Sequence, residues 1–291
     1  MSFMDVIRFI IRRGAQSAMS ETEFLEAELK AWLASEKRQN ILVGKAYAAG
    51  DHDIRLKTRK AIGEGGKATT IRNLPNNIII DNQYGKLVNQ KANYLLAKPF
   101  EVKTEDEVFG EALKPVFNQA FRRILKAVGE DCLNAGVGYL YPYFADNELR
   151  FRRFNPEEIL PFWMDDMHEE LAAFLRVYTV QYYEGRTLKE SIKAQYFTKE
   201  GVRYFTFDSE KLLPDVEAED AVYLQVNGAP MNWEKIPLIV FRANSNERPL
   251  ICRVKSLQDA LNTLLSTFAD NMQEDPRTTI LVIRNYDGED L

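Results

Sequence analysis

The chain has 291 residues, of which 45% are apolar and 28% charged, a balance that is typical of a folded globular protein and excludes a disordered one. Its net charge of −5 lacks the basic surplus of proteins that hold nucleic acid by neutralising phosphates. The two cysteines and two histidines lie far apart, which excludes a disulfide framework and a Cys/His zinc site and favours a reducing compartment.

The N-terminal part is predicted to be helical. The apolar run in residues 1–13 is interrupted by Arg8 and has no small-residue cleavage site, so we expect no signal peptide. No apolar stretch is long enough for a membrane span, and no membrane partner is expected. Residues 20–49 are predicted to form one long helix, because Ser20 and Glu23 make a capping box and apolar residues follow at helical spacing.

Residues 60–77 are expected to be a flexible, glycine-rich loop. The run from Gly63 to Lys67 is similar to a phosphate-binding loop only superficially. Ala61 stands where that motif needs glycine, and Ala68 stands where it needs the serine or threonine that binds magnesium. A nucleotide site is therefore not expected here.

The middle of the chain is predicted to pass from helices to strands. Residues 78–97 and 115–134 have helical periodicity, and Pro99 stops the first of these helices. Short β-branched or aromatic runs, separated by turn residues, then predict strands at Tyr139–Phe144, Leu149–Phe154, Leu175–Tyr183, Lys193–Phe197, Arg203–Phe207, Val222–Leu224 and Leu238–Phe241.

A long two-faced helix is predicted after Pro249, ending at Pro276, with a strand at Thr278–Ile283 beyond it. Its apolar stripe consists of Val254, Leu257, Leu261, Leu264, Leu265 and Phe268. The opposite face carries Lys255, Asp259, Asn262, Thr263, Ser266 and Asp270. The whole pattern predicts an α+β protein.

Three polar clusters were weighed as functional sites. The acidic residues 165–170 could hold a divalent metal, but a solvated acidic turn is the favoured interpretation; Ala172 also replaces the second histidine of a zinc-protease motif. Asp51-His52-Asp53 is better explained as a helix-ending turn than as a general base. Lys91 and Lys98 flank Tyr94, for which an exposed lysine face is favoured over a nucleic-acid patch. We expect no catalytic residue, metal or cofactor.

Four different short motifs follow one another between residue 47 and residue 274. They are Tyr47-x-x-Gly50-Asp51-His52-Asp53-Ile54; Asp81-x-x-Tyr84-x-x-x-Val88-x-Gln90-Lys91-x-Asn93-Tyr94-Leu95-Leu96-x-Lys98-Pro99; Trp233-x-x-Ile236-Pro237-Leu238 with Phe241 and Asn244; and Leu257-x-Asp259-Ala260-x-Asn262 with Ser266, Asn271 and Glu274. Together they resemble the portal proteins of tailed bacteriophages, in the SPP1-type branch.

This resemblance implies a structural subunit rather than an enzyme. Portal subunits form a ring of about twelve copies at one capsid vertex, closed by heterologous interfaces. The ring is the channel for genome packaging, retention and ejection, so double-stranded DNA passes through it without sequence-specific contact. The resemblance also implies contact with the terminase large subunit, the major capsid and scaffold proteins, and the head-completion (adaptor) proteins. It places the protein in the virion, and in the host cytoplasm or a prophage context during assembly.

The resemblance also implies a domain division. Residues 1–248 correspond to the wing (helical over 1–135 and strand-rich over 136–248), residues 249–276 to the first stem helix, and residues 277–291 to the start of the clip. The second stem helix, tunnel loop and crown of the family have no counterpart in this sequence, so we expect a chain that lacks the C-terminal part. The open alternatives are a metal-dependent nuclease using residues 165–170 and a monomeric adaptor of a phage-like particle.

The stem helix carries the candidate site residues. We expect Val254, Leu257, Leu261, Leu264 and Phe268 to pack within the ring or at the interface between subunits. We expect Lys255, Asp259, Asn262, Ser266 and Asp270 to face the channel or a neighbouring subunit.

Overall fold

The computed structural model describes residues 20–62, 66–70, 74–145, 148–226 and 229–274. Its helices are α2 (Glu21–Ala34), α3 (Glu36–Ala48), η1 (Asp53–Leu56), α4 (Gln83–Leu96), α5 (Glu107–Leu113), α6 (Gln119–Ala135), η3 (Pro156–Glu158) and α7 (Ile251–Gln273). Its strands are β1 (Lys60–Ile62), β2 (Ala68–Thr70), β3 (Val137–Ala145), β4 (Glu148–Phe154), β5 (Ile159–Trp163), β6 (Leu171–Glu184), β7 (Thr187–Phe197), β8 (Val202–Asp208), β9 (Lys211–Pro214), β10 (Leu224–Val226), β11 (Ala229–Met231) and β12 (Ile239–Arg242). The predicted α+β class is confirmed.

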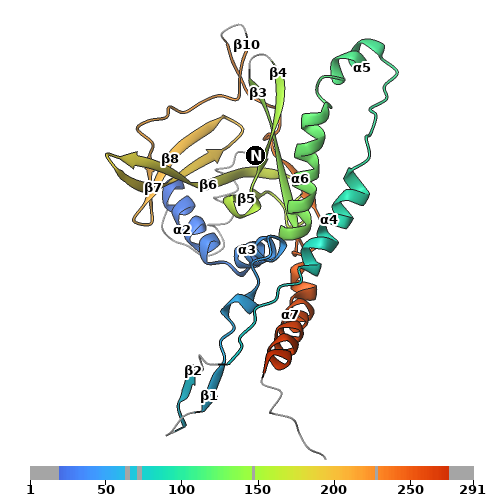
Figure 1. Cartoon of the computed structure of the whole chain (residues 1–291). Helices are drawn as coiled ribbons and strands as arrows, with labels where there is room; N and C mark the ends of the chain where they lie inside the picture. The colour runs from blue at the N-terminus through green and yellow to red at the C-terminus, as the bar shows by residue number, and fades with distance from the viewer. Residues whose placement is uncertain (1–19, 63–65, 71–73, 146–147, 227–228, 275–291) are drawn as a thin grey trace, which may run out of the picture.

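Four layers build the body of the molecule (Figure 1). The sheet β5-β6-β7-β8-β9 and the sheet β12-β3-β4 are both antiparallel. Alternate residues of a strand point to opposite faces, so Leu175 packs toward α2 while its neighbour Phe174 packs toward the smaller sheet. In β3, Tyr139 faces the larger sheet and Leu140 faces α6. The layers are therefore α2, the five-stranded sheet, the three-stranded sheet and α6.

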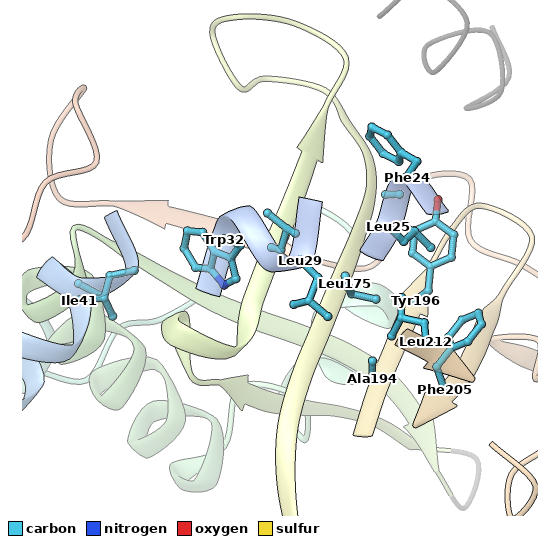
Figure 2. Close-up of a cluster of buried hydrophobic side chains, with 13 residues drawn as sticks. Phe24, Leu25, Leu29, Trp32, Ile41, Leu175, Ala194, Tyr196, Phe205 and Leu212 are labelled. Carbon is cyan, nitrogen blue, oxygen red and sulfur yellow. The ribbon is translucent and has the colours of Figure 1, made fainter. Parts of the chain in front are cut away.

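The core beneath α2 is drawn in Figure 2. Leu25, Leu29 and Trp32 lie one turn apart on α2 and meet side chains from the larger sheet. These partners are Leu160, Ala173, Leu175, Ala194, Tyr196, Phe205 and Leu212. The amphipathic spacing read from the sequence thus explains how the first helix covers the sheet.

The predicted single helix over residues 20–49 is wrong, because the helix is interrupted at Ser35. This residue is extended, with φ −70° and ψ 145°. Its hydroxyl donates to the carbonyl of Trp32 (2.7 Å) and accepts from the N–H of Arg38 (3.2 Å). One serine therefore ends α2 and caps α3, an alternative to continued helix that serine side chains offer. The capping box at Ser20 and Glu23 is confirmed.

The expected flexible loop at residues 60–77 is also wrong in part. β1 and β2 pair as an antiparallel hairpin, with Lys60 opposite Thr70. Figure 1 shows this hairpin projecting from the body at the same end as α7. The glycines at positions 63 and 65 lie outside the described residues.

Most of the other predicted helices and strands are confirmed, with changed bounds. Helices α4 and α6 replace the predicted 78–97 and 115–134, and strands are found at six of the seven predicted runs. Only Leu224 of the run 222–224 belongs to a strand, and β5, β9, β11 and the helix α5 were not predicted. The expected helix near the N-terminus and the strand at 278–283 fall outside the described residues. Within the described part of the chain, no helix combines the length and apolarity needed to cross a bilayer.

Candidate functional site: the long helix and its strap

The first turn of α7 is anchored in a small apolar core. Ile251 is buried there, together with residues from α3, α4 and α6. Its buried partners are Tyr47, Tyr84, Val88, Ala92 and Leu133, with Val43, Ala48, Leu250 and Val254 at the edge. Gly44 allows α3 to cross α6 closely, since a Cβ there would lie 2.0 Å from the carbonyl oxygen of Asn134. The root of α7 is therefore held by three other helices.

Glu247 connects the loop before α7 to the rest of the body. One carboxylate oxygen accepts from His168 Nδ1 (3.0 Å) and Arg242 Nε (2.9 Å), and the other accepts from Lys37 Nζ (2.6 Å). His168 in turn stacks on Trp163, with ring centroids 5.0 Å apart. Burial alone would raise the pKa of Glu247, but the hydrogen bonds from His168, Lys37 and Arg242 lower it to about 2.

We expect Glu247→Gln to remove part of the acid sensitivity of folding. A carboxyl whose pKa is lower in the folded state stabilises that state above its unfolded pKa of about 4.3, and this contribution disappears as the pH falls toward 2. The variant should therefore be less stable at neutral pH and lose less stability between about pH 5 and pH 2. Urea unfolding at several pH values measures both effects. The exposed Glu28 on α2 provides the control, Glu28→Gln, which should keep the slope of the unsubstituted protein. Parallel curves for the Glu247 variant and the unsubstituted protein would contradict the expectation.

The middle of α7 is clamped by residues 76–84, which we call the strap. Four α7 side chains spaced four residues apart accept hydrogen bonds from strap N–H groups. The pairs are Asp270 with Asn77 (2.6 Å), Ser266 with Ile79 (3.0 Å), Asn262 with Asp81 (3.1 Å) and Gln258 with Tyr84 (2.9 Å). Four helical residues rise about 6.0 Å and two extended residues about 6.6 Å, so alternate strap residues match successive helix turns.

Both ends of the β1–β2 hairpin return to Asp270. Lys57 Nζ donates to Oδ2 (2.5 Å), and the Asn77 side chain donates to Oδ1 (2.9 Å). These bonds, from Lys57 first and then from the backbone and side chain of Asn77, lower the pKa of Asp270 to about 2. Arg59 forms a further ion pair with Glu274. The last turns of α7 thus close the base of the hairpin.

We call the four hydrogen bonds between the strap and α7 the strap ladder, and His52 is joined to it through Asn262. It is buried and stacked on Tyr47, with ring centroids 4.5 Å apart. Asn262 Nδ2 donates to His52 Nδ1 (2.7 Å), which leaves His52 Nε2 to donate to the carbonyl of Tyr47 (3.0 Å). Both ring nitrogens are engaged, so the geometry favours the helix-ending turn over a general base. The neighbouring Asp53 and Asp259 both bind Lys255, at 2.5 and 2.8 Å.

The predicted apolar stripe of α7 faces outward in the subunit. Leu257 and Leu264 are each 70% exposed, Phe268 is 66% exposed and Met272 is 71% exposed. Val254, Leu261 and Leu265 are half-buried, and Met272 lies one turn beyond the predicted stripe. The other face is the buried one: Asn262, Ser266 and Asp270, for which we expected the channel or a neighbouring subunit, instead bind the strap of the same chain. Lys255 and Asp259 are half-buried in their own ion pair.

The acidic residues 165–170 form a turn. The carboxylate of Asp165 accepts from the backbone N–H groups of Glu169 (3.0 Å) and Glu170 (2.7 Å), four and five residues further along the chain. Among the described residues, no group of three or more His, Cys, Asp or Glu is arranged to hold a metal ion. Lys91 and Tyr94 are both exposed on α4, in agreement with the expected exposed lysine face.

Comparison with known proteins tests the resemblance directly. The family profile described as "Phage portal protein, SPP1 Gp6-like" matches residues 34–291. The chain belongs to this portal family. It is 24% identical to the portal protein of Bacillus phage SPP1 over 253 residues, which cover 86% of this chain and 50% of that protein. It is 26% identical to the portal protein of Clostridium phage phiCD119 over 270 residues, which cover 87% of this chain and 56% of that protein.

Several residues of the sequence motifs meet at α7. Asp81, Tyr84, Asn262 and Ser266 all belong to motifs that carry the resemblance, and all four take part in the hydrogen bonds between strap and helix. The sequence pattern singles out these residues but does not predict their contacts, because Asp81 and Asn262, for example, are 181 positions apart. The chain spans about half the length of the curated relatives it matches.

Proposed function

We propose that this chain is a structural subunit of a portal ring at the vertex of a phage or prophage capsid. The single observation that carries the proposal beyond family membership is the exposed apolar stripe on α7, because four large side chains project from a helix whose other side is clamped to its own body. Such a surface needs a partner to remove it from water. A ring of identical subunits supplies that partner at every position.

We propose the following division of the chain. The four-layered body, up to about residue 248, corresponds to the wing, α7 corresponds to the first stem helix, and residues 277–291 would begin the clip. In this proposal the ring surrounds double-stranded DNA and meets the terminase large subunit, the capsid and scaffold proteins and the head-completion proteins. The net charge of −5 supports DNA contact that is transient and non-specific.

Native mass spectrometry of the purified chain, with negative-stain images of the same sample, tests the proposal. We expect rings of about twelve subunits with a central hole, as a closed cyclic assembly requires. A chain that remains monomeric at concentrations well above those at which ring proteins assemble would contradict the proposal and favour a monomeric adaptor. A metal-dependent nuclease activity that Asp166→Ala abolishes in the folded chain would contradict it as well.

A further inference from the structure

Two residues with left-handed backbone conformation meet at the loop before α7. Among the described residues other than glycine, four have a positive φ: Ser209 (50°), Glu210 (64°), His168 (59°) and Glu247 (50°). The first two form the two-residue turn between β8 and β9, where this conformation is usual. His168 and Glu247 have no such role, and their side chains hydrogen-bond to each other (3.0 Å). Backbone strain of this kind persists only where the surrounding structure enforces it.

The carboxylate of Glu247 provides this enforcement. Its side chain is 7% exposed, and it accepts from three separate elements: Lys37 of α3, Arg242 of β12 and His168 of the turn before β6. Arg242 also donates to the carbonyl of His168, so the two strained residues share one partner. A left-handed conformation costs a residue other than glycine about tenfold or more in population, and these charge-assisted bonds have to offset that cost.

The loop of residues 243–250, which we call the latch, adjoins open space. On one side it lies directly against Gly136, where a Cβ atom would be 2.3 Å from the carbonyl oxygen of Glu247. Two clefts of about 630 and 680 Å³ also adjoin it, and His168 and Arg242 line both of them. Residues 245–249 line the larger cleft. The latch is therefore packed closely on one side and has room to move on another.

A movement of the latch would reach the first turn of α7. Leu250, the residue before this helix, makes no side-chain capping bond. The start of the helix depends on backbone bonds of the latch instead: Leu250 N–H donates to the carbonyl of Leu133 (3.1 Å), and Cys252 N–H donates to the carbonyl of Pro249 (3.2 Å). A change in the backbone of the latch therefore alters the bonds with which α7 begins.

We propose that the latch is a strained two-state device, with the closed position that the structure shows and an open position. In the open position the Glu247 carboxylate leaves its three donors, the residue relaxes to a negative φ, and residues 245–249 move into the larger cleft. Opening relieves the strained backbone and loses the charge-assisted bonds, so these two opposing terms set the balance. It loosens the first turn of α7, while the strap ladder, which begins at Gln258, holds the rest. The inference concerns a single subunit and does not depend on its assembly into a ring.

Hydrogen exchange followed by mass spectrometry tests the latch in a peptide that covers residues 244–253. We expect Glu247→Ala to raise the exchange rate of this peptide at least tenfold, because the variant keeps the strain and loses the charge-assisted bonds. Glu247→Gly loses the same bonds, but glycine adopts the left-handed conformation without strain. Its exchange rate should therefore lie several-fold below that of Glu247→Ala.

Lys37→Met opens the latch by a second route that leaves its sequence unchanged. It removes one of the three donors, so exchange at residues 244–253 should rise, but less than in Glu247→Ala. Glu210→Gly is the matched control, because it relieves a left-handed glutamate in the β8–β9 turn and should leave exchange of the latch unchanged. A peptide covering strap residues 77–84 reports global unfolding and should exchange at the same rate in all forms.

Unchanged exchange at residues 244–253 in both Glu247→Ala and Lys37→Met would overturn the proposal, because the carboxylate would then not hold the latch closed. Faster exchange in Glu247→Gly than in Glu247→Ala would overturn it as well, since strain would then not favour the open position. If Glu247→Ala also raises exchange at the strap, Lys37→Met decides: a rise confined to residues 244–253 supports the proposal, and any other result overturns it.

Discussion

Replacing Asn262 by leucine is expected to destabilise the subunit by roughly 3 kcal/mol or more. The side chain is fully buried, and its oxygen accepts from Asp81 N and Gln258 Nε2, both at 3.1 Å, while its nitrogen donates to His52 Nδ1 at 2.7 Å. Leucine has a similar volume but leaves the Asp81 N–H and His52 Nδ1 unpaired in the interior, while Gln258 Nε2 keeps only its bond to the carbonyl of Asp81 (2.8 Å). Each unsatisfied buried group costs about 1–3 kcal/mol, so the loss should be large for a single substitution.

Urea unfolding followed by circular dichroism measures this effect. Asn89→Leu is the matched control, because Asn89 is an exposed asparagine on the neighbouring α4 and its replacement should change stability by less than about 0.5 kcal/mol. Equal midpoints for the two variants would show that the strap ladder does not hold α7 in place.

Replacing Phe268 by glutamate is expected to abolish ring assembly without destabilising the subunit. Phe268 is 66% exposed in the isolated chain, so a charge there remains in water and the free energy of unfolding should change by less than about 0.5 kcal/mol. In the proposed ring the same position is covered by a neighbour, and an unpaired buried charge costs several kcal/mol at each interface. Since a closed ring repeats the contact at every subunit, the penalty accumulates.

Native mass spectrometry measures ring assembly, and thermal unfolding of the same preparation measures the stability of the subunit. Val216→Glu serves as the control, because Val216 is fully exposed and lies in the loop after β9, away from α7. We expect the control to assemble as the unsubstituted chain does. Intact rings of the Phe268 variant would contradict the assignment of the α7 stripe as a subunit interface.

The sequence predicts the existence of α7 well, but not which side of it is buried. Its apolar stripe has clear helical periodicity, and periodicity normally identifies the face that packs on the body. Here the polar row Gln258, Asn262, Ser266 and Asp270 is the buried one, because it satisfies backbone N–H groups of a segment nearly 190 positions away. No local sequence pattern predicts such a long-range pairing. In addition, an apolar stripe that packs on another subunit has the same sequence periodicity as one that packs on the body of its own subunit.

The two local errors have different causes. At Ser35 a signal was present, a serine followed by Glu36, but the continuous apolar spacing on both sides favoured an unbroken helix. At residues 60–77 the glycine-rich composition indicated a loop, and the strands of the hairpin are only three residues long on each side. Short strands of this kind depend on their surroundings more than on their own composition.

The hydrogen-bonding residues of the strap and of α7 repeat at nearly equal distances along their two segments. The repeat is about 6.0 Å for four residues of the helix and about 6.6 Å for two residues of an extended chain. Donor and acceptor therefore shift relative to each other by about 0.6 Å per step. After three or four regular steps the offset reaches about 2 Å, more than an N–H···O bond tolerates. The series ends before this limit: it has two regular steps, from Asn77 to Ile79 and from Ile79 to Asp81, and the next step, to Tyr84, takes three residues as α4 begins. A longer strap in this register could not clamp a longer helix, so the two ends of α7 are held by other elements: the α3, α4 and α6 core at Ile251, and the ion pair of Arg59 with Glu274.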